Sequence, residues 1–248
     1  MRREVRVHQD LEELSHAAVQ CIIEQITTTI VGGTHCTVVL SGGTTPRRVY
    51  ELLGAQYRDQ VPWKSVCLFW GDERYVPQID PSSNYRVVQE TLLSRVPIPS
   101  ENVYPMPTRY QDPGEGARRY EETLRTRFSS AWPRFDLMLL GLGVDGHTAS
   151  LFPRSPLLAE ASRWVAVARA PVEPPVRMTL TLPVLNHARN VFFLVSGAEK
   201  ASALCQAVAD PPDPAACPAS AVRPPDGTVI WWVDQQAATL LPKSARTQ

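Results

Sequence analysis

The residues best suited to chemistry follow the apolar run at 136–140. In the string Gly141-Leu-Gly-Val-Asp-Gly-His147, a carboxylate, Asp145, and an imidazole, His147, stand two positions apart in a glycine-rich turn. An imidazole takes up and gives back a proton near neutral pH, and glycines let a ligand approach the main chain closely. This pattern predicts an acid–base site at a strand end, where α/β folds bind ligands. A glycine-rich loop with a merely solvated histidine is the alternative.

A second apolar run, at 36–40, ends in Ser41-Gly-Gly-Thr-Thr-Pro46. Proline suits the first turn of a helix, and the free amides and dipole at a helix N-terminus attract anions. The segment is not a Walker P-loop, because the GxxxxGK[ST] spacing and its lysine are missing. It predicts an anion site, with an ordinary turn and helix cap as the competing interpretation.

A third strand end, after the run at 66–70, carries Asp72 and Arg74 in the string GDER. A solvated salt-bridge cluster would explain these charges alone, but the other two strand ends point to the same edge of a sheet. Arg177 and Lys200 are further basic candidates further along the chain. A phosphate group recruits Arg and Lys in addition to backbone amides, so these residues fit a phosphorylated ligand.

The elements that must position these residues alternate between strand and helix. Such alternation predicts an α/β, Rossmann-like fold of three layers, αβα, with a mostly parallel sheet whose carboxyl ends form the working edge. We find no internal repeat or domain boundary, and expect a single domain over 1–248, with the proline-rich stretches 96–113 and 210–226 as surface loops. Strands are expected at 3–8, 36–40, 66–70, 136–140, 164–168, 191–195 and 228–233, and helices at 11–30, 46–53, 84–93, 116–128, 198–208 and 235–241.

Composition excludes several classes of protein. The formal net charge is +0, which argues against nucleic acid as a partner. The five cysteines are scattered and form no CxxC pair, which argues against a disulfide framework or a zinc site. There is no signal-peptide pattern or apolar run long enough for a membrane helix, so a cytoplasmic protein without a membrane partner is expected. A covalent serine hydrolase is disfavoured because GxSxG is missing.

Taken in order, four strings resemble the 6-phosphogluconolactonase family: SGGTTP (41–46), GDERYVP (71–77), SSNY (82–85) and GLGVDGHTASLFP (141–153). The segments at 177–186, 197–201 and 231–234 extend the resemblance. It runs from near residue 5 to near residue 240, and the GDER and DGHTASLFP strings together make it specific. The family is related in fold to glucosamine-6-phosphate deaminase, which implies a NagB/RpiA-like arrangement.

The resemblance implies hydrolysis of 6-phospho-D-glucono-1,5-lactone to 6-phospho-D-gluconate, in the oxidative pentose phosphate pathway. It implies no metal or organic cofactor, a small sugar-phosphate lactone as partner, and a monomer or weak dimer. His147 would act as general base, while Asp145 would either orient the imidazole or cap a following helix. The implied substrate contacts are Ser41, Gly42, Gly43, Thr44, Asp72, Arg74, Asn84, Arg177 and Lys200.

Two other functions remain as alternatives. The related deaminases carry a carboxylate five positions after the active-site histidine, whereas this chain has Phe152 there and no acidic residue within 148–153. A deaminase lacking that group would be crippled, so the lactonase interpretation gains. A non-catalytic sugar-phosphate sensor is the other alternative, and the intact Asp145 and His147 argue against it.

Overall fold

A parallel sheet of seven strands runs through the centre of the protein. The computed structural model describes residues 2–33 and 35–242. The strand order is β1-β10-β9-β6-β2-β3-β5, and every neighbouring pair is parallel. The α/β class and the mostly parallel sheet predicted from the sequence are therefore confirmed. The strands are β1 (Arg2–His8), β2 (Cys36–Leu40), β3 (Val66–Trp70), β5 (Val103–Tyr104), β6 (Leu137–Leu140), β9 (Asn190–Val195) and β10 (Thr228–Asp234).

A second, three-stranded sheet is antiparallel, in the order β4-β8-β7. It contains β4 (Asp72–Arg74), β7 (Val165–Arg169) and β8 (Val176–Leu180). The strand expected at 164–168 is present as β7, but it pairs antiparallel with β8 and lies outside the parallel sheet. The connection at 170–175 is too short for the crossover that a parallel pair needs, so the chain turns back on itself. No sequence pattern predicts β4, because its three residues are all charged and lack the alternation typical of a strand.

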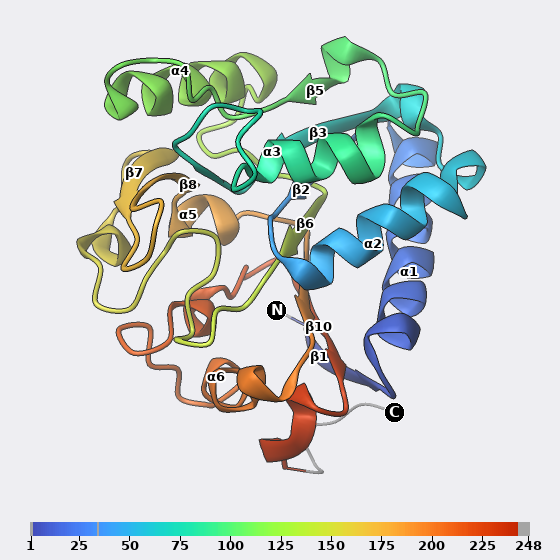
Figure 1. The fold of residues 1–248 in the computed structure, drawn as a ribbon, viewed down its shortest axis with the longest axis vertical. Coiled ribbons are helices and arrows are strands. Elements are labelled where there is room, and N and C mark those ends of the chain that lie inside the picture. The colour runs from blue at the N-terminus through green and yellow to red at the C-terminus, as the bar shows by residue number, and fades with distance from the viewer. Residues whose placement is uncertain (1, 34, 243–248) are drawn as a thin grey trace.

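Helices cover both faces of the main sheet. In Figure 1, α1 and α2 lie to the right of the sheet, and α6 and the small sheet with α5 lie to its left. The helix expected at 84–93 continues from α3 into a π-helical turn, η3. The helices are α1 (Leu11–Gly32), α2 (Thr44–Ala55), α3 (Asn84–Val88), η3 (Gln89–Leu93), α4 (Pro113–Arg127), α5 (Leu182–Leu185) and α6 (Ala201–Ala207).

Several connections contain only a single 3-10 turn. The helix expected at 235–241 is wrong in extent, because only Ala237–Leu240 forms a turn and Pro242 then prevents continuation. The helix expected at 198–208 begins with such a turn before α6. The 3-10 turns are η1 (Arg58–Gln60), η2 (Trp63–Ser65), η4 (Ser100–Asn102), η5 (Pro156–Ala159), η6 (Ala198–Lys200), η7 (Pro218–Ala221) and η8 (Ala237–Leu240).

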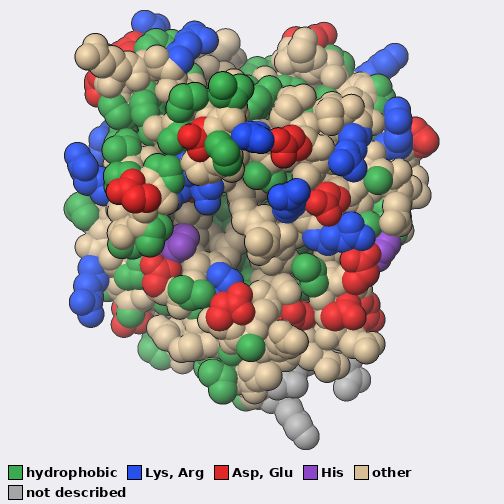
Figure 2. Space-filling model, viewed as in Figure 1, with side chains coloured by type: hydrophobic (Ala, Val, Ile, Leu, Met, Phe, Trp, Pro, Cys, Tyr) green, Lys and Arg blue, Asp and Glu red, His purple; other side chains and the backbone are tan. Residues whose placement is uncertain are grey.

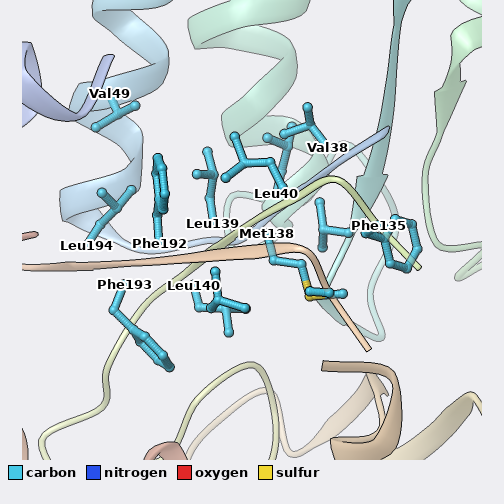
Figure 3. Close-up of a cluster of buried hydrophobic side chains, with 14 of the residues drawn as sticks. Val38, Leu40, Val49, Phe135, Met138, Leu139, Leu140, Phe192, Phe193 and Leu194 are labelled. Carbon is cyan, nitrogen blue, oxygen red and sulfur yellow. The ribbon is translucent and has the colours of Figure 1, made fainter. Parts of the chain in front are cut away.

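The core lies on both faces of the central strands. Figure 3 shows Phe192 pointing toward Val49 of α2, while the next residue of β9, Phe193, points to the opposite face beside Leu140. Phe193 also stacks on Trp231 of β10, with ring centroids 3.8 Å apart. Strands buried on both faces read as continuous apolar runs. For this reason β2, β3 and β6 were readily predicted from sequence.

Two buried tyrosines complete the hydrogen bonding where β2 and β3 leave the sheet. The Tyr50 hydroxyl accepts from the Ser41 amide at 3.0 Å and donates to the Ser41 carbonyl at 2.8 Å. The Tyr120 hydroxyl accepts from the Trp70 amide at 2.9 Å. Buried backbone groups need partners, and burial raises the pKa of both phenols. These hydroxyls fix the main chain next to two of the strand ends singled out above.

Charged side chains of both signs are interspersed on the face that Figure 2 shows. On α4 they form pairs one helical turn apart, such as Arg119 with Glu115 and Arg125 with Glu121. Such exposed pairs contribute little to stability. Within residues 2–33 and 35–242, no helix combines the length and the apolar character needed to cross a membrane.

Tyr120→Phe should lower the free energy of unfolding by about 1–3 kcal/mol, because the Trp70 amide then loses its acceptor in a buried position. Urea denaturation measures this change. The control is Tyr57→Phe, whose half-buried hydroxyl contacts His16 and whose effect should stay within about 0.5 kcal/mol. Equal effects of the two substitutions would contradict the role assigned to Tyr120.

Candidate functional site

A cavity of about 190 Å³ opens at the carboxyl ends of the parallel strands. Its walls come from the segments after β2, β3 and β6 and from the end of β9, as expected for the working edge of the sheet. Nine of the predicted site residues line it: Ser41, Gly42, Gly43, Thr44, Asp72, Arg74, Asn84, His147 and Lys200. Other lining residues, with no chemical signal of their own in the sequence, include Thr45, Pro46, Ala149, Leu194 and Val195.

His147 and Asp145 form the acid–base pair of the cavity. Nδ1 of His147 lies 2.5 Å from Oδ1 of Asp145. A carboxylate can only accept, so Nδ1 carries a proton and Nε2 presents its lone pair. Burial alone would raise the pKa of Asp145, but the hydrogen bonds and charge of His147 outweigh burial and hold this pKa below its usual value. The hydrogen bond fixes the ring by its Nδ1 side, so that Nε2 is the basic nitrogen whenever the imidazole is neutral.

Of the two roles considered for Asp145, the geometry favours orientation of the imidazole. The same Oδ1 also accepts from the His147 amide at 3.2 Å. No helix begins at this turn; the next helical turn is η5, where Ser155 caps the amide of Leu157. The helix-capping alternative is therefore wrong.

The loop that carries His147 is held by hydrogen bonds within itself and by contacts with the segment 210–226. The Gly143 amide donates to the His147 carbonyl at 2.8 Å, and Gly146 adopts a φ of 85°. The Ala219 amide donates to the Gly146 carbonyl at 3.0 Å, and a Cβ on Gly146 would collide with Cys217. The proline-rich segment 210–226 thus packs against this loop and supports it. Neither this segment nor the proline-rich segment 96–113 lines the cavity.

Strand β4 divides its three residues between two faces. Side chains alternate along a strand, so Asp72 and Arg74 face the cavity while Glu73 points the other way. Arg74 donates to the Ser82 carbonyl, which anchors its guanidinium at the rim. The strand thereby presents an acceptor and a cation to the same ligand.

Glu73 is a buried carboxylate, 1% exposed, that ties β4 to the start of α3. It accepts from the amides of Asn84 and Tyr85 at 2.7 Å each, and from the Arg74 amide at 2.8 Å. Burial raises the pKa of Glu73 to about 7, although these amides oppose the shift. Sequence analysis did not single out Glu73; the only signal was its place between two charged neighbours.

Asn84 joins two of the strand ends. Its Nδ2 donates to the Asp72 carbonyl at 2.9 Å, and its carboxamide packs on Gly42 so closely that a Cβ there would overlap it. A residue larger than glycine at 42 would displace Asn84 from the cavity wall. This contact explains the glycine at position 42.

The glycine turn after β2 and the start of the segment after β9 supply backbone donors and a cation to the cavity. Gly43, with a φ of 109°, precedes α2, and the amides of Gly42 and Gly43 have no acceptor within the described residues. Lys200, at the end of η6, lines the same cavity and forms no ion pair with any residue that the structure describes. Free amides and an ammonium group suit an anionic ligand.

Arg177 is the predicted phosphate contact that the structure does not bring to the cavity wall. It lies opposite Arg74 on the neighbouring strand β8 and is 5% exposed. Burial, and after it the charge of Arg74, lowers the pKa of Arg177. Sequence spacing could not show that these two arginines lie side by side.

The described residues of the site form no cluster suited to bind a metal ion. Over the described part of the chain, no three His, Cys, Asp or Glu side chains are grouped so that they could hold a metal ion. The chemistry available to the cavity from its own residues is acid–base chemistry at His147 and binding of an anionic, hydroxylated ligand.

Comparison with known proteins places this site in a family. The profile of the family described as Glucosamine-6-phosphate isomerases/6-phosphogluconolactonase matches residues 9–231. A 6-phosphogluconolactonase of Synechocystis sp. is 44% identical over 227 residues, which cover 90% of this chain and 92% of the relative. These matches confirm the family resemblance.

Solved structures agree with the fold. The 6-phosphogluconolactonase of Trypanosoma brucei superposes with a TM-score of 0.83 at 31% identity, covering 97% of this chain and 99% of its own. A monomeric glucosamine-6-phosphate deaminase superposes with a TM-score of 0.81, covering 96% and 99%. Its identity is only 20%, so this second likeness concerns the fold alone.

The raised pKa of Glu73 predicts a pH-dependent contribution to stability. Because the folded-state pKa of about 7 lies above the ordinary value of 4.5, this contribution is complete below the ordinary value and is lost as pH rises through the folded one. The stability of the wild type relative to Glu73→Gln should therefore fall by on the order of 2 kcal/mol between about pH 5 and about pH 8.

Urea denaturation of both proteins at the two pH values measures this difference. Glu24→Gln, at an exposed position of α1, corrects for the loss of one negative charge. A difference that stays flat or grows with pH would show that Glu73 is ionised throughout the range.

Proposed function

The chain belongs to the glucosamine-6-phosphate isomerase/6-phosphogluconolactonase family, and we propose that it hydrolyses 6-phospho-D-glucono-1,5-lactone to 6-phospho-D-gluconate, a step of the oxidative pentose phosphate pathway. The observation that carries this proposal is the hydrogen bond between Asp145 and His147, the second of which lines the cavity: Nδ1 is held, and Nε2 bonds to no residue that the structure describes. A lactone is an activated ester, so one base and donors for the oxyanion suffice.

In the proposed mechanism, Nε2 of His147 takes a proton from water as the water oxygen attacks the C1 carbonyl. The tetrahedral intermediate then collapses with cleavage of the bond from C1 to the ring oxygen. The imidazolium returns its proton to that leaving oxygen, which becomes a hydroxyl of the open-chain acid. Asp145 stabilises the imidazolium formed between the two steps. Such general acid–base catalysis contributes about 10²–10⁴-fold.

The amides of Gly42 and Gly43 are the proposed donors to the developing oxyanion, because both are unpaired beside the cavity. Preorganised donors of this kind stabilise charge that appears only in the transition state. The Gly143 amide donates to the His147 carbonyl at 2.8 Å and is therefore not one of the proposed donors.

Phosphate binding is assigned to the cations at the cavity wall. Lys200 and Arg74 both line the cavity, and Asp72, which lines it as well, can accept from the sugar hydroxyls. Arg177 lies beside Arg74 but outside the cavity lining, so its effect on the phosphate would pass through Arg74. Its role as a direct phosphate contact stays a prediction with less support than that of Lys200.

A deaminase is the competing enzyme. The position where the resemblance puts the deaminase carboxylate holds Phe152, whose ring packs on the imidazole of His147 with centroids 4.7 Å apart. Phe152 is 8% exposed and can neither accept nor give a proton. An apolar contact in place of a carboxylate favours the lactonase, whose reaction needs only one base.

His147→Ala should lower turnover of freshly generated 6-phosphogluconolactone at least a hundredfold, by the usual contribution of a general base, and leave product affinity nearly unchanged. A pH-stat assay measures turnover against the spontaneous rate, and calorimetry measures binding of 6-phosphogluconate. The wild-type protein is also tested for ammonia release from glucosamine 6-phosphate. Ammonia release without lactone hydrolysis would overturn the proposal, and binding without either activity would favour a sensor.

Lys200→Ala should raise KM for the phosphorylated lactone about tenfold or more, the usual effect of losing a charge-assisted hydrogen bond. KM for unphosphorylated gluconolactone should change little. Lys64→Ala, an exposed lysine outside the cavity, serves as the control and should leave both values unchanged. An equal rise in KM for the two lactones would argue against a contact between Lys200 and the phosphate.

A further inference from the structure

Ser150 connects the loop that carries His147 to strand β4. Its hydroxyl donates to Oδ2 of Asp72 at 2.7 Å, across 78 residues of sequence. Ser150 is 1% exposed and Asp72 is 7% exposed, so water cannot readily replace this bond. Ser150 itself does not line the cavity. The Ser150 hydroxyl is thus connected to the cavity through Asp72, which does line it.

The backbone around Ser150 is fixed from several directions. The Thr148 hydroxyl donates to the Gly141 carbonyl at 2.9 Å, which returns the loop to the end of β6. The Ser150 amide donates to the Thr179 hydroxyl at 3.2 Å, and Thr179 pairs with Asp72 in the small sheet. Between them, Ala149 has a φ of 47°, a conformation that alanine rarely adopts. With Ala149 in this conformation, the Thr148 hydroxyl bonds to Gly141 and the Ser150 hydroxyl bonds to Asp72.

The bond from Ser150 is the shortest that the Asp72 carboxylate makes within the described residues. Its other oxygen, Oδ1, lies 3.3 Å from Nδ2 of Asn84. A hydrogen bond to a charged group is shorter and stronger than one between neutral groups. One oxygen of Asp72 is thus held firmly, while the other keeps acceptor capacity on the side of the cavity.

We propose that Ser150 is a positioning residue that fixes the Asp72 carboxylate relative to His147. His147 lies in the loop after β6 and Asp72 lies in strand β4 of the small sheet, and the Ser150–Asp72 bond links that loop directly to that strand. This inference rests on the proposed function, in which Asp72 accepts from the hydroxyls of the lactone. Ser150 thereby sets how well the sugar ring is held while His147 acts on its carbonyl.

Ser150→Ala should lower kcat/KM for the lactone by about ten- to hundredfold, the range for one hydrogen bond to a charged group. The loss should appear mainly as a higher KM, as for Asp72→Asn, because hydroxyl binding acts on the ground state as well. His147→Ala should instead lower kcat. The matched control is Ser15→Ala, which removes an equally buried hydroxyl that donates to the Leu11 carbonyl within α1; it should not change kcat/KM.

A double-mutant cycle then tests the route of action. In the Asp72→Asn background, Ser150→Ala should cause little further loss if Ser150 acts through that carboxylate. The inference would be overturned if Ser150→Ala caused its full loss of kcat/KM in the Asp72→Asn background. It would also be overturned if, in the wild-type background, Ser150→Ala lowered kcat/KM no more than Ser15→Ala does. Ser150→Cys, which fills similar space with a weak donor, gives the same test if the alanine variant does not fold.

Failure of the proposed function would give a different result, namely no lactone turnover by the wild-type protein. The cycle is then measured on the affinity for 6-phosphogluconate by calorimetry, with the same expectations. Non-additive losses in affinity would support the positioning role of Ser150. Additive losses would overturn it.

Discussion

Parallel pairing of β2, β6 and β9 is the constraint on which the rest of the structure depends. In a parallel sheet all carboxyl ends lie at the same edge, so segments far apart in the chain must meet there. The glycine-rich turn after β2, the His147 loop after β6 and the approach to Lys200 after β9 share one cavity as a direct consequence. The apolar side chains on both faces of these strands hold the edge in place.

The small antiparallel sheet adds what the parallel sheet alone does not provide. Because side chains alternate along β4, Asp72 faces the ligand while Glu73 is buried against the start of α3. By bonding to the start of α3, the Glu73 carboxylate therefore helps to fix the strand that carries Asp72. Ser150 then ties this strand to the His147 loop, so that the two sheets present one set of functional groups.

Sequence analysis was most successful where a single strong pattern decides the outcome. The runs at 36–40 and 66–70 match β2 and β3 residue for residue, because burial on both faces leaves no polar alternation to mislead. It failed where tertiary contacts override local preference. β4 forms a strand because it pairs with β8 and because Glu73 accepts from amides at the start of α3. The strand near 164–168 pairs antiparallel with β8 because the connection between the two is short.

The sequence by itself determined the α/β class, the family and the polar groups at three strand ends, since these depend on residue type and local spacing. Only the tertiary structure decided how these groups pair. It placed Asp145 on Nδ1 of His147, Phe152 on the imidazole ring, and Arg177 beside Arg74 but outside the cavity wall. The physical reason is that such contacts depend on strand register and loop conformation, which are fixed by packing across the whole chain and not by neighbours in sequence.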